Sequence, residues 1–201
     1  MLKKILIIPC LLFFSLGLWQ SFRWHWKVNI IQNMNLPSVC PLPSDNLEKF
    51  NYKRVKIDGI LSNIELYVFA GQRGYHVLSP MLLATGSYML VNKGIIDHKK
   101  EREPKIEKVV IEGILYCDNK KNWFVGNDAV SNTWFTFNAE EISKELGIGL
   151  EKCILWQNDF DNRLTIQPMR HLEYAITWFL LSVIWLVMFI VFYRRNSNSS
   201  V

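Results

Sequence analysis

Two long apolar runs without charged side chains constrain the fold of this 201-residue chain more than any other feature. They cover residues 5–22 and 175–193, and each is close to the roughly 20 residues that a helix needs to cross a bilayer. The second run could instead be a buried core helix, but a helix that is apolar on all faces at a chain end has little core to enter. The sequence therefore predicts a membrane protein with two transmembrane helices.

The first run could also be the apolar region of a cleaved signal peptide, because Lys3 and Lys4 precede it. Small residues stand near Gly17, but no A-x-A cleavage pattern follows them. The apolar run continues through Trp19 and Phe22 before a charge appears. These observations favour an uncleaved membrane anchor.

Charges at the outer ends of the two runs indicate the orientation of the chain. Two lysines lie in residues 1–4 and two arginines in residues 194–201, and basic residues favour the cytoplasmic side. We therefore expect both termini in the cytoplasm and residues 23–174 on the exported, periplasmic side. The inverted topology is the alternative, since Arg23 and Arg170 flank the runs on that side.

The formal charge of +5 belongs largely to these cytoplasmic ends. Without those four cations, basic residues outnumber the 18 acidic residues by one. The charge therefore indicates orientation beside a lipid bilayer and does not predict a nucleic-acid partner.

Short β-type segments follow one another through the exported part, separated by glycine and asparagine turns. Such spacing is typical of a mainly-β domain, either an antiparallel sheet or a barrel. The predicted strands are residues 53–61, 64–70, 75–83, 87–96, 108–116, 123–125, 134–137 and 153–156.

Three further segments complete the exported domain. Asn138, with a glutamate three positions on and Gly147 as a stop, predicts one short helix over residues 139–146. The proline-containing residues 28–51 are linker-like at first, and the mixed-charge residues 97–108 predict a solvated hairpin loop.

The four cysteines leave their pairing open. Cys10 lies in the first apolar run, and the exported part holds Cys40, Cys117 and Cys153, which allow one disulfide with one thiol left over. Unpaired cysteines are an equal alternative, and no C-x-x-C or C-x-x-x-C clamp for a metal is present.

Motifs for enzymatic chemistry are absent from the sequence. There is no glycine-rich phosphate loop, no G-x-S-x-G elbow and no H-E-x-x-H pair. The carboxylate pairs belong to the predicted helix start at Glu140 and Glu141 and to a turn at Asp159 and Asp161. We therefore expect a protein that is not an enzyme.

Aromatic, basic and histidine side chains gather at the exported ends of both runs. If the helices continue, each cluster lies on one helix face. The residues alone favour an aromatic belt at the membrane surface, and a site for haem or another planar ligand near His171 is the alternative. The first cluster is Trp19, Arg23 and Trp26, and the second is His171, Tyr174 and Trp178.

The same residues carry a resemblance to the surfeit-locus family of cytochrome c oxidase assembly proteins. The most specific motifs are G-x-W-Q-x-x-R-x-x-W-K at residues 17–27 and H-L-x-Y-A-x-T-W-F at residues 171–179. Residues 52–59, 74–80 and 91–94 also resemble family stretches. Three departures stand out: Lys93 where arginine is usual, I-I-D at residues 95–97 where W-V-P is usual, and Met169 in place of a polar residue.

This resemblance implies an assembly factor that helps to deliver or insert haem a into the catalytic subunit of the oxidase, with the haem a synthesis machinery as a second partner. His171 would then be the iron ligand, with Trp19, Tyr174 and Trp178 as flat walls and Arg23 or Arg170 pairing a propionate.

Two other functions remain as alternatives. One is a membrane-anchored scaffold that binds an oxidase subunit without handling haem, and the other is an unrelated envelope interaction protein. The apolar run begins at residue 5 and leaves no room for a transit peptide, so we expect a bacterial cytoplasmic membrane.

Overall fold

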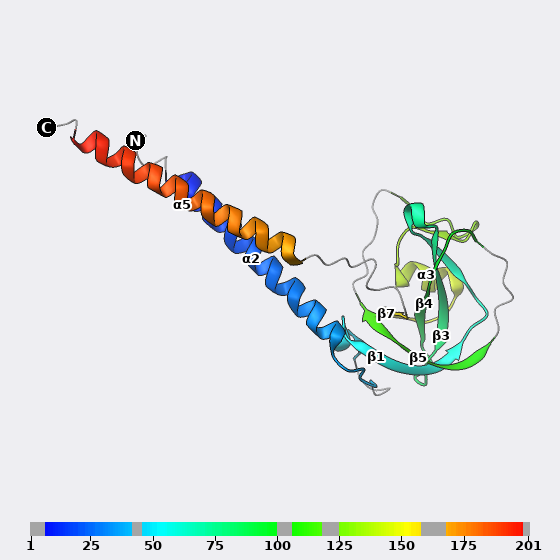
Figure 1. Cartoon of the computed structure of the whole chain (residues 1–201). Helices are drawn as coiled ribbons and strands as arrows, with labels where there is room; N and C mark the ends of the chain where they lie inside the picture. Colours follow the sequence, from blue (N-terminus) through cyan, green and yellow to red (C-terminus); the bar gives the residue numbers. More distant parts are fainter. Residues whose placement is uncertain (1–6, 42–45, 100–105, 118–124, 158–167, 199–201) are drawn as a thin grey trace. The chain divides into compact units, whose positions relative to one another are not determined.

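The computed structural model describes residues 7–41, 46–99, 106–117, 125–157 and 168–198 (Figure 1). The chain divides into two compact units. One unit contains Met1–Gln32 together with Ile166–Val201, and the other contains Asn33–Thr165.

The first unit holds one long helix and all but the last three residues of another. Helix α2 covers Ile8–Asn35 and helix α5 covers Pro168–Asn198. Within the described residues, one helix is long and apolar enough to cross a membrane by length and composition, and it is the Pro168–Arg195 part of α5. Most large apolar side chains of this helix are exposed, as expected for a helix that a protein core does not surround. The second apolar run is therefore confirmed as a helix able to span a bilayer, and the first crossing stays a prediction.

Helix α2 continues well beyond the first apolar run, to Asn35. The prediction of a linker from residue 28 onward was wrong for residues 28–35. Proline restricts the residue before it to extended backbone, so Pro37 sets the point by which the helix has to end. The apolar side chains of Ile30 and Met34 are buried, and this burial explains why the helix persists to its last turn.

The described part of the second unit holds a seven-stranded sheet (Figure 1). Its strands are β1 (Arg54–Leu61), β2 (Leu66–Phe69), β3 (Tyr75–Leu82), β4 (Tyr88–Ile96), β5 (Glu107–Tyr116), β6 (Thr133–Trp134) and β7 (Leu150–Trp156). Of the two short 3-10 helices, η1 (Leu47–Phe50) precedes β1, and η2 (Gly71–Arg73) lies between β2 and β3.

The sheet closes on itself as a small barrel. The strand order is β1-β5-β7-β4-β3-β2-β6, and an additional pairing joins β1 to β3. Strands β1, β5, β7, β4 and β3 therefore form a ring, while β2 and β6 extend the sheet beyond β3. The barrel-like prediction is confirmed. The sheet is mixed rather than purely antiparallel, because β4 pairs with β7, and β2 with β6, in parallel.

The predicted hairpin at residues 97–108 was wrong, because strands β4 and β5 are not neighbours. Strand β7 lies between them: Leu155 is in register with Val91 on one side and with Leu115 on the other. The run Cys153–Trp156 is apolar and buried throughout, and a strand that is apolar on both faces is stabilised most in a central position. Residues 100–105 of the connection lie outside the described part.

The strand predicted at residues 134–137 is shorter in the structure, since β6 ends at Trp134. The side chain of Asn127 accepts hydrogen bonds from the backbone N–H groups of Phe135 and Thr136, at 2.7 and 3.2 Å. These donors are therefore not available to continue the sheet. For the strand predicted at residues 123–125, Val125 is in a bend, and the other two residues lie outside the described part.

The barrel interior is apolar and tightly closed. Its central cluster packs side chains from β1, β3, β4, β5 and β7 that are at most 5% exposed. Burying each of these side chains contributes about 1.5–3 kcal/mol, which makes the cluster the main stabilising feature of this unit. The cluster consists of Val55, Met81, Met89, Val91, Ile111, Leu115, Cys153 and Leu155.

The short helix α3 covers Ala139–Leu146, as predicted. The side chain of Asn138 accepts hydrogen bonds from the N–H groups of Glu140 and Glu141, at 3.1 and 3.4 Å. Gly147 ends the helix in the left-handed region with φ of 65°, where glycine has no steric penalty. Ile142 is fully buried, and the helix packs against β7.

A disulfide joins Cys117, just after β5, to Cys153 in β7. The sequence had left this pairing open. Cys40 is an exposed free thiol, and Cys10 is a half-buried one in α2. The disulfide crosses the two antiparallel strands and lies against the apolar cluster.

Replacing Cys117 and Cys153 together by alanine is expected to lower the free energy of unfolding by about 3–4 kcal/mol, because the bridge closes a loop with a sequence separation of 36. Denaturant unfolding of the full chain in detergent, without reductant, measures this loss. Cys40→Ala is the matched control and should leave the unfolding midpoint unchanged. An equal midpoint for the double variant and the control would contradict the assignment.

Candidate functional site

Helices α2 and α5 pack against each other in antiparallel directions (Figure 1). Contacts at residues 10, 13, 14, 17 and 20 of α2 recur every three or four residues, so they lie on one helix face. Their partners on α5 run the opposite way along the chain. From one end of the pair to the other, the contacts are Cys10 with Ser182, Phe13 with Trp178, Phe14 with Phe179, Gly17 with Phe179, and Gln20 with His171.

A polar contact holds the helix pair at Cys10 and Ser182. The Ser182 hydroxyl donates to the backbone carbonyl of Cys10 at 3.1 Å, and the two side chains lie 3.4 Å apart. Ser182 is buried, so its hydroxyl requires a partner inside the pair. Interhelical hydrogen bonds of this kind stabilise helix association in apolar surroundings.

The helices approach closely at Gly17. A Cβ atom at this position would lie 2.7 Å from a ring carbon of Phe179, which is closer than van der Waals contact. Phe13 stacks on Trp178 nearby, with ring centroids 5.7 Å apart and planes inclined by 19°. Glycine therefore makes room for the Phe179 ring at this point of the helix pair.

His171 and Gln20 meet at the far end of this contact face. The Nδ1 atom of His171 lies 2.7 Å from the Oε1 atom of Gln20. A carbonyl oxygen only accepts hydrogen bonds, so Nδ1 carries the proton. In a neutral imidazole, Nε2 then keeps the lone pair that binds metal ions.

Two cations lie close enough to act electrostatically on His171, namely Lys27 and Arg23. The guanidinium of Arg23 also lies 4.9 Å from the ring centre of Trp26, within range of a cation–π interaction. This end of the helix pair therefore combines a histidine nitrogen, two positive charges and an aromatic face.

The structure brings together some of the predicted site residues and places others apart. His171 is half-buried at the contact with α2, while Tyr174 and Trp19 are each 54% exposed. Trp178 packs on Phe13, seven residues along α5 from His171, which corresponds to about 10 Å of helix. Arg170 is exposed, and the described contacts connect His171 to α2 through Gln20.

The prediction from sequence had not included Gln20 or Lys27 among the site residues. A signal for Gln20 existed, because it is an amide inside the uncharged run 5–22. An amide in apolar surroundings requires a hydrogen-bond partner, and on a helix beside a second helix that partner is expected to be interhelical.

Two stretches of the second unit that carried the family resemblance meet where β3 pairs with β4. The buried His76 in β3 and the buried Asn92 in β4 lie 3.1 Å apart, at Nδ1 and Nδ2. The Oδ1 atom of Asn92 accepts from the N–H of Gly94 at 2.9 Å. Lys93, which replaces an arginine, pairs with the largely buried Glu65 at 3.1 Å. These residues therefore stabilise the fold at the β3–β4 pairing.

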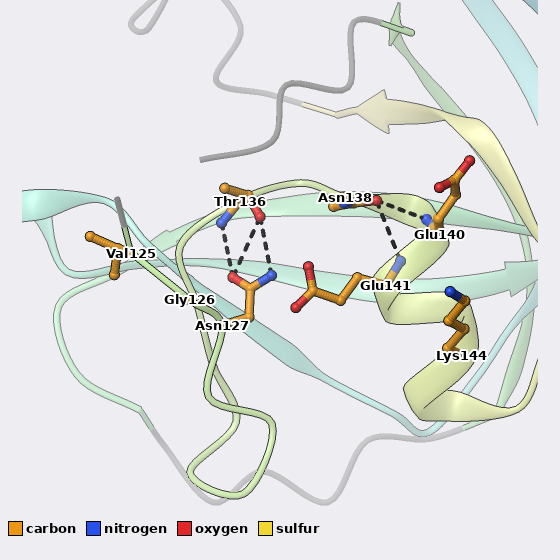
Figure 2. A pocket seen from close by; sticks show the side chains of 8 residues that line it. All are labelled: Val125, Gly126, Asn127, Thr136, Asn138, Glu140, Glu141 and Lys144. Atoms are coloured by element: carbon orange, nitrogen blue, oxygen red, sulfur yellow. Dashed lines mark hydrogen bonds between the residues drawn. The ribbon is translucent and has the colours of Figure 1, made fainter. Parts of the chain in front are cut away.

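A polar pocket of about 230 Å³ lies at the start of α3 (Figure 2). Figure 2 shows Asn127 bonded to Thr136, and Asn138 bonded to the helix N–H groups. Within the described ranges, no three His, Cys, Asp or Glu side chains gather to hold a metal ion. The pocket is lined by Val125, Gly126, Asn127, Thr136, Asn138, Glu140, Glu141 and Lys144.

Together, the fold and the site define a small closed β barrel in a chain that also carries a pair of long helices with a histidine held between them. The SURF1 family matches this chain over residues 7–183. The chain belongs to the SURF1 family, and the resemblance to surfeit-locus proteins is confirmed.

Named relatives agree over nearly the whole chain. The SURF1-like protein of Rickettsia conorii is 30% identical over 212 residues, covering 90% of this chain and 86% of the relative. That of Rickettsia felis is 28% identical, with 96% of each chain covered. Surfeit locus protein 1 of Homo sapiens is 25% identical, covering 90% of this chain and 74% of the human protein.

The register of the helix pair predicts a cross-link. In a Cys40→Ala background, S182C should form a disulfide with Cys10 under mild oxidation, because the side chains at positions 10 and 182 lie 3.4 Å apart. Protection of both thiols from maleimide labelling measures it. V183C is the matched control, since Val183 is 56% exposed on α5. Equal cross-linking of both variants, or none in S182C, would contradict the register.

Proposed function

We propose that this chain is an assembly factor for haem–copper cytochrome c oxidase, and that it carries haem a as cargo for the catalytic subunit. Membership of the SURF1 family supports the proposal. So does the retention of both span-end motifs, at residues 17–27 and 171–179, whose resemblance implied this role.

The hydrogen bond between His171 and Gln20 is the single observation that carries the proposal. It joins one residue from each of the two most specific motifs, across a sequence separation of 151. The bond orients an imidazole ring at the end of the helix pair, where neighbouring groups can contact a ligand.

The residues present fit a haem group. Haem iron accepts the lone pair of a histidine nitrogen, and Nε2 of His171 is the nitrogen that Gln20 does not occupy. Arg23 and Lys27 supply positive charge for the propionate carboxylates, and the exposed rings of Trp19 and Tyr174 supply flat apolar surface. A single histidine ligand suits a carrier, because the cargo has to leave again.

We further propose that both helices span a bacterial cytoplasmic membrane, with the termini in the cytoplasm and the β barrel in the periplasm. The antiparallel helix pair supports a two-span topology, and the flanking charges support this orientation. The Cys117–Cys153 disulfide supports an oxidising compartment for the barrel.

A binding experiment tests the cargo site. Purified full-length protein in detergent, mixed with ferric haem a, should show an absorption shift typical of histidine ligation, and His171→Ala should remove it. His25→Ala is the matched control, because His25 is an exposed histidine on the same helix pair, with its ring against Trp24. Unchanged binding by the His171 variant would refute the site.

A genetic experiment tests the assembly role. A strain lacking the protein should lose most terminal cytochrome c oxidase activity and haem a content, because the catalytic subunit would not receive its haem. Complementation with the wild-type chain should restore both. Full activity in the deletion strain would refute the role, whereas restoration by the His171→Ala variant would indicate a scaffold that does not handle haem.

A further inference from the structure

Gln20 is the polar group of α2 that contacts His171, and it has no charged neighbour within the apolar run that contains it. Its Oε1 atom lies 2.7 Å from Nδ1 of His171, a short distance for an N–H···O hydrogen bond. Gln20 is half-buried at the contact with α5, and a polar group removed from water is stabilised by such a partner.

This contact selects one tautomer of the imidazole. A neutral histidine carries its proton on either ring nitrogen, and an acceptor beside Nδ1 favours the form with the proton there. The lone pair then lies on Nε2, which points away from the hydrogen bond. The bond also restricts rotation of the ring, which lies on the first turn of α5, three residues after Pro168.

We propose that Gln20 is the positioning residue for His171, holding the ring in the tautomer and orientation in which Nε2 binds haem iron. This inference rests on the proposed function. Histidine ligands commonly donate their second N–H to a carbonyl or carboxylate, and losing that partner weakens metal binding roughly 10- to 100-fold. Gln20 supplies such a carbonyl from the opposite helix.

Other contacts already hold the helix pair together. The Cys10–Ser182 hydrogen bonds, the Phe13–Trp178 stack and the close approach at Gly17 lie elsewhere along α2. Removing Gln20 therefore changes the surroundings of His171 without separating the helices. This distinction allows a positioning role to be separated from a purely structural one.

Three substitutions in the purified full-length protein test the inference, with ferric haem a as the probe. Gln20→Leu removes the acceptor and should weaken binding roughly 10- to 100-fold, with loss of the histidine-ligated absorption bands. Gln20→Glu provides a stronger acceptor, so binding should persist and the iron reduction potential should fall, because the ring donates more electron density. Ser182→Ala, which removes the hydrogen bonds of the Ser182 hydroxyl to Cys10, should change neither binding nor potential.

The outcomes separate this inference from the proposed function. If His171→Ala abolishes the bands while Gln20→Leu leaves affinity and spectrum unchanged, the positioning role is refuted and the proposed site stands. If Ser182→Ala causes the same loss as Gln20→Leu, the effect is a loosened helix pair and the inference is refuted. If His171→Ala changes nothing, the proposed site and this inference are both refuted.

Discussion

Pairing of polar side chains inside an apolar helix pair is the constraint on which the arrangement of α2 and α5 depends. A hydrogen-bonding group without a partner is costly in such surroundings, so Ser182 bonds to Cys10 and Gln20 bonds to His171. The two contacts are ten residues apart on α2, about 15 Å along the helix. A slip by one turn would break both, so together they define the register at which the aromatic rings between them pack.

The second unit depends on a different constraint, the burial of a strand that is apolar on both faces. Leu155 of β7 is fully buried and paired on both sides, with Val91 and Leu115. Strand β7 pairs in parallel with β4 on one side and antiparallel with β5 on the other. The Cys117–Cys153 disulfide also joins β7, through Cys153, to the end of β5. The barrel closes because β1 then reaches β3.

Features that depend on neighbouring residues were predictable, and features that depend on distant ones were not. Helix α3 was predicted because Asn138 and Gly147 lie beside it in the chain. The linker prediction at residues 28–35 and the length of β6 were wrong, because the burial of Ile30 and the hydrogen bonds of Asn127 decide them. For the site, the histidine was recognisable from its residue type and motif. The uncharged run indicated that Gln20 needs a partner, but only the folded structure identified that partner as His171 on the opposite helix.

The sequence by itself determined the two apolar helical segments, the mainly-β character of the middle and the family, because each follows from local composition, alternation or motif. Only the tertiary structure decided that β7 separates β4 from β5, that Cys117 pairs with Cys153, and that Gln20 faces His171. The physical reason is the same in each case. These contacts join residues far apart in the chain, and the free energy that selects them comes from burial and hydrogen bonding in the folded state, which leave no periodic trace in the sequence.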